Sequence, residues 1–553
     1  MSIAKTTLLI VLATILLAGV AQAAVAPDWA VRSSVNGSTA QGVAVDAVGN
    51  AYVAVTVARS GHFNIGIIKY DPAGTELWAR EAPGIGLGYD NAAGIVINSL
   101  GNIVITGRSW RGPTALNYEI VTRAYNPAGD SLWVARFNGV SSREDAPVAI
   151  AADGAGNTYV AGYANATAIL SYSGRAFVTI KYGPTGSLLW YWTYSGNWSS
   201  GANAIALDRH GNAYVTGGIY ENNPSFEDYL TIKYNSVGTF AWASRYAGPT
   251  ATNDEAKAIA VDDSCNVYVT GASGDGSDIA TVKYDSTGAQ RWVKRYDGPA
   301  HLTDAGAGIG VDWLHNVYVT GREGLPGTPN TYDIVTMKYS GSGDSLWVRR
   351  YASLLSPYDD PIALRVEGGG NSLVLASSYG AGSTPYSAFK DYLTLGYGAD
   401  GTPNWEARYA GPGDGDDFAS AMAVGADGSL YVTGASSDYL PGTGYAGTIK
   451  YSRPTADVAG DGRPVRDPAR LSWNYPNPCS RSTTIEFALA SAERVLLKVY
   501  DLQGREVATL VDEVRAAGTH AIRWDASLAP AGVYFYRLAA GRRSETGRTV
   551  VMR

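Results

Sequence analysis

The sequence predicts an all-β protein, in which an eight-bladed β-propeller is followed by a small immunoglobulin-like β-sandwich. Three observations lead to this fold class. A unit of short β-type runs recurs eight times between residues 24 and 451, a different pattern of alternating strands fills residues 471–553, and no stretch of useful length has helical periodicity. The composition agrees, because 46% of the residues are hydrophobic and only 17% are charged. Such a chain can bury a core, which excludes a disordered protein.

The first 23 residues have the features of a secretory signal peptide. Lys5 precedes an apolar run from Leu8 to Val20, and a small-x-small site follows at Ala21-Gln22-Ala23. The run is shorter than the ~20 residues that a membrane-spanning helix needs. We expect cleavage after Ala23, and no cysteine follows this site that would carry a lipid anchor. The mature chain, residues 24–553, is therefore expected to have no transmembrane segment.

Each repeat is marked by a turn-forming pair, usually Gly-Asn, in front of an apolar strand. The second residues of these pairs are Asn50, Asn102, Asn157, Asn212, Asn266, Asn316, Asn371 and Ser429. In the fifth copy, four runs rich in β-branched and aromatic residues lie at 258–261, 267–270, 281–284 and 292–295. Four such runs with short turns predict one antiparallel sheet per repeat. Stacking eight sheets around an axis buries both faces of each one, which is the propeller solution.

Two series of aromatic residues support the count of eight and predict how the ring closes. A tyrosine ends the third run of each repeat, at Tyr70, Tyr125, Tyr182, Tyr234, Tyr284, Tyr339, Tyr397 and Tyr451. A tryptophan lies in the fourth run, at Trp78, Trp133, Trp190, Trp242, Trp292, Trp347 and Trp405. No tryptophan follows Tyr451, whereas Trp29–Arg32 stands alone near the start of the mature chain. We expect this run to complete the last blade, because closure removes an exposed sheet edge.

Two resemblances accompany this pattern. The runs at 211–217 (Gly-Asn-Ala-Tyr-Val-Thr-Gly) and 231–234 (Thr-Ile-Lys-Tyr) resemble the SBBP family of bacterial β-propeller repeats, and the resemblance covers roughly residues 29–453. The usual name of that family implies seven blades, so the count of eight departs from it. The turn at 284–288 that leads to Trp292 is similar to the tryptophan-docking turn of quinoprotein-like propellers. This second resemblance is architectural and implies no cofactor.

The remaining chain divides into a linker and a second domain. Residues 452–470 are rich in proline, glycine and charge, which is typical of a linker. Residues 471–553 carry short alternating strands, for example at 485–489 and 495–499, which predict the sandwich. This domain resembles the type A C-terminal sorting domain of type IX secretion, a relative of the immunoglobulin-like module of flagellar hook-capping proteins. The motif residues include Tyr475, Pro476, Asn477, Pro478, Gly504, Gly532 and Tyr534.

The resemblance of residues 471–553 to the sorting domain implies a route of export. The chain would cross the inner membrane by the general pathway, and the type IX secretion machinery would then recognise the C-terminal domain and carry the chain across the outer membrane. The resemblance thus implies a secreted or cell-surface protein of a Gram-negative-type bacterium, which reaches its destination through the periplasm. Cys479 stands where an aromatic residue usually follows the second proline of the motif, which makes the local packing differ.

Six aspartates recur eight residues before the turn acid of their repeats, just ahead of the first strand. They are Asp90, Asp145, Asp254, Asp304, Asp359 and Asp417. The first strand of a propeller blade normally lines the central channel, so the six carboxylates could form a ring that binds a hard cation such as calcium, or a basic ligand. Alternatively, each aspartate caps its own strand by accepting a backbone N–H. Regular recurrence in the repeat favours the capping role.

The sequence carries no recognisable catalytic constellation. The five histidines have no metal-binding spacing, and no Gly-x-Ser-x-Gly motif is present. A net charge of -7 argues against a nucleic-acid partner. We therefore expect a monomeric, non-enzymatic propeller without a cofactor that binds an extracellular glycan or protein. The alternative is a polysaccharide-active hydrolase or lyase with a site in one of the irregular loops, at 220–228, 324–333 or 379–391.

Overall fold

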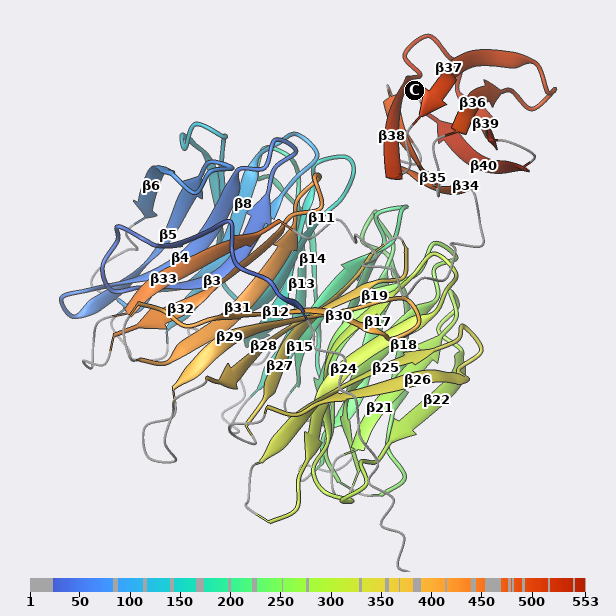
Figure 1. Ribbon diagram of the computed structural model, residues 1–553. Coiled ribbons are helices and arrows are strands. Elements are labelled where there is room, and N and C mark those ends of the chain that lie inside the picture. The colour runs from blue at the N-terminus through green and yellow to red at the C-terminus, as the bar shows by residue number, and fades with distance from the viewer. Residues whose placement is uncertain are drawn as a thin grey trace, which may run out of the picture.

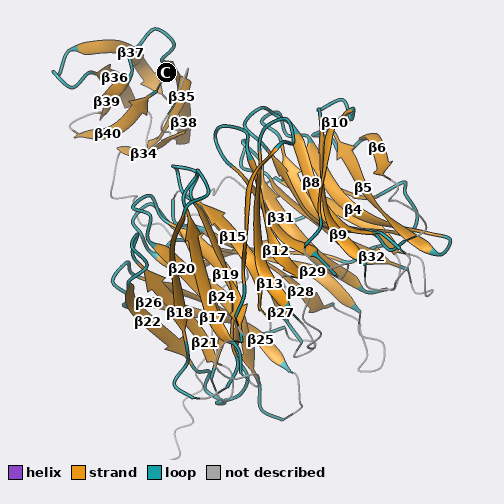
Figure 2. Cartoon of the chain, turned by 180° about the vertical axis from the view of Figure 1, so that it is seen from behind, coloured by secondary structure: helices purple, strands orange, loops and turns teal. Residues whose placement is uncertain are grey.

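The protein is seen in a computed structural model that describes residues 23–552 with short internal gaps. The gaps are 83–87, 113–116, 140–143, 166–173, 197–199, 221–225, 251, 275–277, 328–330, 354–357, 368, 381–388, 413–414, 439–443, 453–468, 476–478, 480–481, 490–492, 516–517 and 541–542. The described residues form strands, turns and loops, and none of them lies in a helix (Figure 2). The chain is therefore all-β over the part that the structure describes, as the sequence predicts.

Residues 29–451 form eight four-stranded antiparallel sheets, which we number I to VIII in chain order (Figure 1). Sheet I contains β3 (Ser38–Val45), β4 (Ala51–Arg59), β5 (His62–Tyr70) and β6 (Glu76–Ala82). Sheet II contains β7 (Asn91–Ile97), β8 (Ile103–Trp110), β9 (Tyr118–Tyr125) and β10 (Ser131–Phe137). Sheet III contains β11 (Ala146–Ala152), β12 (Thr158–Asn165), β13 (Arg175–Tyr182) and β14 (Leu188–Tyr194). Sheet IV contains β15 (Ser200–Leu207), β16 (Ala213–Ile219), β17 (Asp228–Tyr234) and β18 (Phe240–Tyr246).

The other four sheets repeat this order, except that the fourth strand of the last sheet comes from the start of the chain. Sheet V contains β19 (Asp254–Val261), β20 (Val267–Ser273), β21 (Asp278–Tyr284) and β22 (Gln290–Tyr296). Sheet VI contains β23 (Ala305–Val311), β24 (Val317–Gly324), β25 (Tyr332–Tyr339) and β26 (Ser345–Tyr351). Sheet VII contains β27 (Asp360–Val366), β28 (Ser372–Tyr379), β29 (Lys390–Tyr397) and β30 (Pro403–Tyr409), and β1 (Ala23–Ala24) joins it. Sheet VIII contains β31 (Asp417–Val424), β32 (Leu430–Ser437), β33 (Gly444–Tyr451) and β2 (Trp29–Arg32).

Turn chemistry sets the hairpin between the first two strands of each sheet. In sheet V, Asp262 Oδ1 accepts hydrogen bonds from the backbone N–H groups of Ser264 (2.9 Å) and Asn266 (2.8 Å). The residue before this asparagine takes a positive φ, which glycine adopts without strain in most of the repeats. Cys265 (φ 62°) and His315 (φ 61°) occupy this position in sheets V and VI. The local Asp-x-x-x-Asn signal therefore specifies the same turn even where glycine is replaced.

Adjacent sheets are joined by a tryptophan and a lysine that share one acceptor. In sheet V, Trp292 Nε1 donates to the backbone oxygen of Gly341 (3.2 Å), which lies in a turn of sheet VI, and Lys283 Nζ donates to the same oxygen (2.8 Å). The lysine ammonium lies 5.1 Å from the ring centroid of Tyr268, a favourable cation–π geometry. The same arrangement recurs between most neighbouring sheets, which gives each tryptophan of the repeat its structural role.

The last sheet packs against the first in the same manner. Strand β2 pairs antiparallel with β33, with Trp29 opposite Lys450, which is the pairing that the sequence predicts. Trp29 Nε1 donates to Pro72 O of sheet I (3.0 Å), and Tyr431 OH donates to Gly49 O (2.8 Å). Figure 1 shows β31, β32 and β33 beside β3 and β4. The stack of sheets is propeller-like, with each first strand packed on the preceding sheet.

The C-terminal unit has two sheets around one core. Its strands are β34 (Ala469–Tyr475), β35 (Ser482–Leu489), β36 (Glu493–Tyr500), β37 (Glu506–Arg515), β38 (Gly518–Asp525), β39 (Gly532–Ala540) and β40 (Arg543–Val551). One sheet has the order β34-β35-β38 and the other β37-β36-β39-β40. Phe487 and Leu497 from the two sheets lie in the same buried cluster as Cys479 and Trp524. This core contains the unpaired thiol of Cys479, so the local packing accommodates cysteine where the sequence suggested a departure.

The start of the described chain bears on the predicted signal peptide, and its secondary structure bears on the expected lack of a transmembrane segment. Residues 1–22, the predicted signal peptide, lie outside the described residues, and Ala23 is the first residue of β1. Within the part of the chain that the structure describes, no helix has the length and hydropathy that a membrane crossing requires.

Candidate functional site

The connections at the two edges of the sheets differ in how much they vary from one sheet to the next. One edge carries the hairpin turns between the first and second and between the third and fourth strands, and these turns keep the same length and the same backbone hydrogen bonds. The opposite edge carries the connections between the second and third strands, which run from two residues (60–61) to ten (380–389). The three irregular loops predicted from the sequence all belong to this edge, although residues 221–225, 328–330 and 381–388 lie outside the described residues. We call it the loop face, since variable loops are where binding sites concentrate.

The six predicted aspartates, here called the strand-start acids, lie on the loop face but are buried. All six are at most 2% exposed. Asp90 accepts a hydrogen bond from Trp110 N (2.8 Å). Each of the other five accepts one from the backbone N–H six residues earlier, at Gly139, Gly248, Gly298, Ser353 and Gly411. Burial raises the pKa of Asp145 and Asp304 to about 6. This geometry matches the capping role, in which each carboxylate fixes the chain where it enters a new sheet.

A cation site is not assembled from these acids among the described residues. The one group there whose ligand atoms lie within 4.8 Å of one another is Asp262, Asp263 and His315, at the hairpin edge. Asp262 Oδ2 already accepts hydrogen bonds from Asn266 Nδ2 (2.7 Å) and Tyr268 OH (3.0 Å), and His315 Nδ1 lies 3.1 Å away. These donors satisfy the carboxylate as part of the hairpin, so we interpret the group as structural.

Two positions that face each other across neighbouring sheets vary in chemistry, and the sequence analysis did not identify them. One is the residue before the strand-start acid, and the other lies seven residues before the tyrosine that ends the third strand of the preceding sheet. A short parallel contact brings them together, as where Asp90 N donates to Phe63 O (3.0 Å). The resulting seam pairs are Phe63 with Tyr89, Tyr118 with Glu144, Glu227 with Asn253, Tyr332 with Tyr358 and Lys390 with Asp416. Counting positions along the repeat would have found them.

A second repeated feature that connects neighbouring sheets is an arginine three residues after the blade tryptophan. In sheet VI, Arg350 Nε donates to Glu323 Oε2 (2.7 Å) and Arg350 Nη2 donates to Tyr296 OH of sheet V (2.6 Å). Arg408 Nη2 makes the equivalent bond to Tyr351 OH (3.0 Å). The sequence shows this arginine in a Trp-x-x-Arg-Tyr pattern that recurs in sheets IV to VII. It links neighbouring sheets beneath the loop face and so fixes the geometry of the seams.

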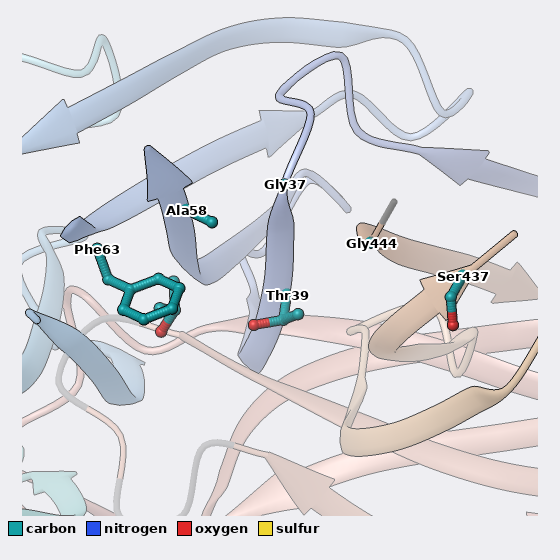
Figure 3. A pocket seen from close by; sticks show the side chains of 7 residues that line it. Gly37, Thr39, Ala58, Phe63, Ser437 and Gly444 are labelled. Atoms are coloured by element: carbon teal, nitrogen blue, oxygen red, sulfur yellow. The ribbon is translucent and has the colours of Figure 1, made fainter. Parts of the chain in front are cut away.

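At the seam between sheets VIII and I, both variable positions are glycine and a hollow results. Gly37 N donates to Gly444 O (3.0 Å), so the two backbones meet without side chains between them. The hollow has a volume of about 310 Å³ and is lined by Gly37, Thr39, Thr56, Ala58, Phe63, Ser437 and Gly444. Figure 3 shows Phe63, Thr39 and Ser437 around it, contributed by β5, β3 and β32. The lining is uncharged and combines one aromatic ring with three hydroxyl groups.

A different seam, between sheets IV and V, gathers acids. Glu227 lies against Gly218, where a Cβ atom would come within 1.6 Å of Glu227 Oε1, so glycine is what makes room for this carboxyl group. Burial, together with the charge of Glu255, raises the pKa of Glu227 to about 7. Tyr220 is hydrogen-bonded to Glu227, and Lys257 pairs with Glu255. Glu227 belongs to the irregular loop 220–228, and a comparable group lies at the loop 324–333, where burial, with the charges of Asp359 and Glu323, raises the pKa of Asp333 to about 6.

The residues of the sorting-domain motif are partly placed. Pro476, Asn477 and Pro478 lie outside the described residues, and Tyr475 ends β34. Gly504 has a φ of 77° in the turn after β36, and Gly532 begins β39. Tyr534 is 5% exposed, its hydroxyl donates to Pro530 O (2.8 Å), and its ring lies 5.2 Å from that of Trp524. The described members of the motif thus support turns and core of the C-terminal unit.

Comparison with known families assigns this unit. Residues 474–552 match the secretion system C-terminal sorting domain. The chain therefore carries a sorting domain at its C-terminus, and this indicates export through type IX secretion to the cell surface or the extracellular space. The route predicted from the sequence is confirmed at this level. No curated protein matches the chain.

Solved structures with similar folds are distant. Sqt1 from Chaetomium thermophilum is 9% identical, with 78% of this chain and 100% of that chain covered and a TM-score of 0.48. PorZ, a bacterial surface component of the type IX secretion system of Porphyromonas gingivalis, is 12% identical, with 93% and 81% covered and a TM-score of 0.26. The polysaccharide lyase Uly1 is 10% identical, with 75% and 90% covered and a TM-score of 0.39. None reaches 0.5, so the fold description rests on the sheets of this chain.

Proposed function

We propose that the chain is a secreted or cell-surface, non-enzymatic propeller that binds a glycan on its loop face, after export through the type IX machinery by means of its C-terminal domain. The observation that carries the proposal is the contrast between the two edges. The hairpin edge repeats the same turns in every sheet, whereas the seam pairs of the loop face change their chemistry from one sheet to the next. Residues that vary within a fixed frame are the ones free to serve recognition.

The proposed architecture is a closed ring of eight blades, one for each of sheets I to VIII, built from SBBP-type repeats over residues 24–451. The contacts of Trp29 and Tyr431 with sheet I support closure, because they reproduce the contacts between other neighbours. We further propose a linker at 452–470 and an immunoglobulin-like domain at 471–553. Its strand orders and the bond from Tyr534 OH to Pro530 O, four residues upstream, support this, since a tyrosine corner is a hallmark of such sandwiches.

The hollow between sheets VIII and I is the proposed ligand position. An aromatic ring offers an apolar face on which the C–H groups of a sugar ring can stack, and hydroxyl groups exchange hydrogen bonds with sugar hydroxyls. Phe63 supplies the aromatic ring, and Thr39, Thr56 and Ser437 supply the hydroxyl groups. Because no charged residue lines the hollow, a neutral sugar unit fits it better than a uronic acid or a phosphorylated ligand. The proposal needs no metal or other cofactor.

A glycan array followed by calorimetry on the mature protein tests this function. Gly444→Leu is the decisive variant, because the nearest atoms to a Cβ at this position are 3.9 Å away, so the new side chain fills the hollow without strain. We expect it to weaken binding of a neutral glycan at least tenfold. Gly154→Leu, in a hairpin turn with no atom within 4 Å of the added Cβ, is the matched control and should bind normally. Binding that is unchanged in Gly444→Leu would place the site elsewhere and refute the proposal that the hollow is the ligand position.

A second function is favoured by the acids at the seam between sheets IV and V. A carboxylic acid with a pKa near 7 can serve as a general acid at neutral pH, and a polysaccharide-active hydrolase or lyase needs such a group. Glu227 has a pKa raised to about 7, and Glu255 supplies a second carboxylate. Turnover of a polysaccharide that Glu227→Gln abolishes would establish this alternative. Saturable glycan binding without any turnover would remove it.

A further inference from the structure

The outer strand of sheet III differs from its counterparts in carrying no charge. Strand β14 reads Leu-Leu-Trp-Tyr-Trp-Thr-Tyr from residue 188 to 194. The outer strands β6, β10, β18, β22, β26 and β30, and β2 of sheet VIII, each contain at least one arginine. Charged side chains on an edge strand discourage other chains from pairing with it. Sheet III lacks this protection.

Strand β14 is also exposed. Leu188, Leu189 and Tyr191 are each 50% or 51% exposed, and Trp192 is 44% exposed, although its ring stacks on Tyr234. On the neighbouring outer strands, the apolar residues Leu132, Val134 and Phe240 are exposed as well. The result is an apolar stripe along the rim of sheets II to IV, centred on an edge strand. Contiguous exposed apolar surface of this kind marks an interaction site.

The edge of β14 is open in the part of the chain that the structure describes. Its inner side pairs with β13, from Leu188 opposite Tyr182 to Tyr194 opposite Phe177, and no described strand pairs with its outer side. Sheet VII shows that such an outer edge accepts another strand. There, β1 pairs in parallel with β30, placing Ala24 opposite Glu406, and Val25 N donates to Glu406 O (3.0 Å). The equivalent groups of β14 are available to a strand from outside.

We infer that β14 pairs antiparallel with β14 of a second copy of this chain, which makes the protein a two-fold symmetric dimer. Two copies with a net charge of -7 repel each other in most orientations. The repulsion is weakest where the two uncharged β14 strands approach each other. A two-fold axis through Tyr191 would place Leu189 opposite Thr193 and Trp190 opposite Trp192 of the other copy. The pair of Trp190 with Trp192 is a favourable aromatic cross-strand contact, and the interface is self-complementary, as two-fold symmetry requires. This inference replaces the monomer expected from the sequence.

Sedimentation velocity on the mature full-length protein tests the dimer. We expect the wild type to sediment as a dimer and the double variant Leu189→Lys/Tyr191→Lys to sediment as a monomer with an unchanged circular dichroism spectrum. The matched control is Leu346→Lys in β26, which is 51% exposed at the same position of its sheet and should remain dimeric. A monomeric wild type, or a double lysine variant that stays dimeric, would overturn the inference.

A cysteine cross-link provides a second test that does not depend on disrupting the interface. In a pair centred on Tyr191, the two Cα atoms of this residue lie about 4.5–5.5 Å apart, which suits a disulfide. With Cys265 replaced by glycine, Tyr191→Cys should give a covalent dimer under mild oxidation, whereas Leu346→Cys should not. Failure of Tyr191→Cys to cross-link, or equal cross-linking of both variants, would contradict the proposed register.

Discussion

Truncation of a single strand-start acid separates the capping role from the cation ring. Asp304 is fully buried and accepts hydrogen bonds from Gly298 N (2.5 Å) and Gly324 N (2.8 Å). Asp304→Ala leaves two buried N–H groups without an acceptor. Each such group costs about 1–3 kcal/mol, and since water can reach part of the space left by the carboxylate, we expect a total loss of about 2–4 kcal/mol in the free energy of unfolding.

Urea unfolding at neutral pH, followed by circular dichroism, measures this loss. The matched control is Asp297→Ala, which removes a half-exposed carboxylate paired with His301 and should change the free energy of unfolding by less than about 0.5 kcal/mol. Each protein is measured in calcium and in a chelator. The capping role predicts that the loss is the same in both. If calcium stabilised the wild type and not Asp304→Ala, or if Asp304→Ala unfolded like the wild type, the reasoning would be refuted.

Three further predictions follow from the contacts between and within the units. Lys181→Met removes the bond from Lys181 Nζ to Ser236 O (2.8 Å) but keeps the stem on Tyr159, so urea unfolding should show a loss of about 1–2 kcal/mol. Because burial raises the pKa of Asp145 to about 6, the folded state binds protons that the unfolded state releases between about pH 4 and 6. Stability contributed by this group therefore falls as the pH rises through that window, and Asp145→Asn should flatten the pH dependence of the melting temperature. Tyr534→Phe, which removes only the bond to Pro530 O, should cost the C-terminal unit about 0.5–1.5 kcal/mol in calorimetry.

The sequence was sufficient for features that depend on local patterns. The Asp-x-x-x-Asn turns and the alternation of apolar residues specify each hairpin within a few residues, so the strands around Asp262 could be predicted. The pairing of Trp29 with the last repeat could also be predicted, because the missing tryptophan of that repeat left one place unfilled. For the strand-start acids the sequence favoured the capping role over the cation ring, but the burial of Asp304 that supports capping becomes visible only when neighbouring sheets are packed.

Features that depend on contacts between sheets were not found from the sequence. The hollow exists because Gly37 and Gly444, distant in the chain, meet across one seam. The pairing of Glu227 with Asn253 depends on how neighbouring sheets pack, and only a count of equivalent positions along the repeat would have indicated it. The absence of charged residues in β14 is visible in the sequence. It indicates an interaction site only because β14 is an outer strand with an open edge.

Hydrogen exchange of the peptide that contains Trp29–Arg32 tests the closed ring most directly. The proposed ligand position spans the seam between sheets VIII and I, so it exists only if β2 holds its place beside β33 and sheet VIII packs on sheet I. Closure predicts that the backbone amides of β2 exchange as slowly as those of Trp347–Arg350, which occupy the same place in sheet VI. Exchange of the Trp29–Arg32 amides at the rate of an unstructured peptide, while those of Trp347–Arg350 stay protected, would contradict it.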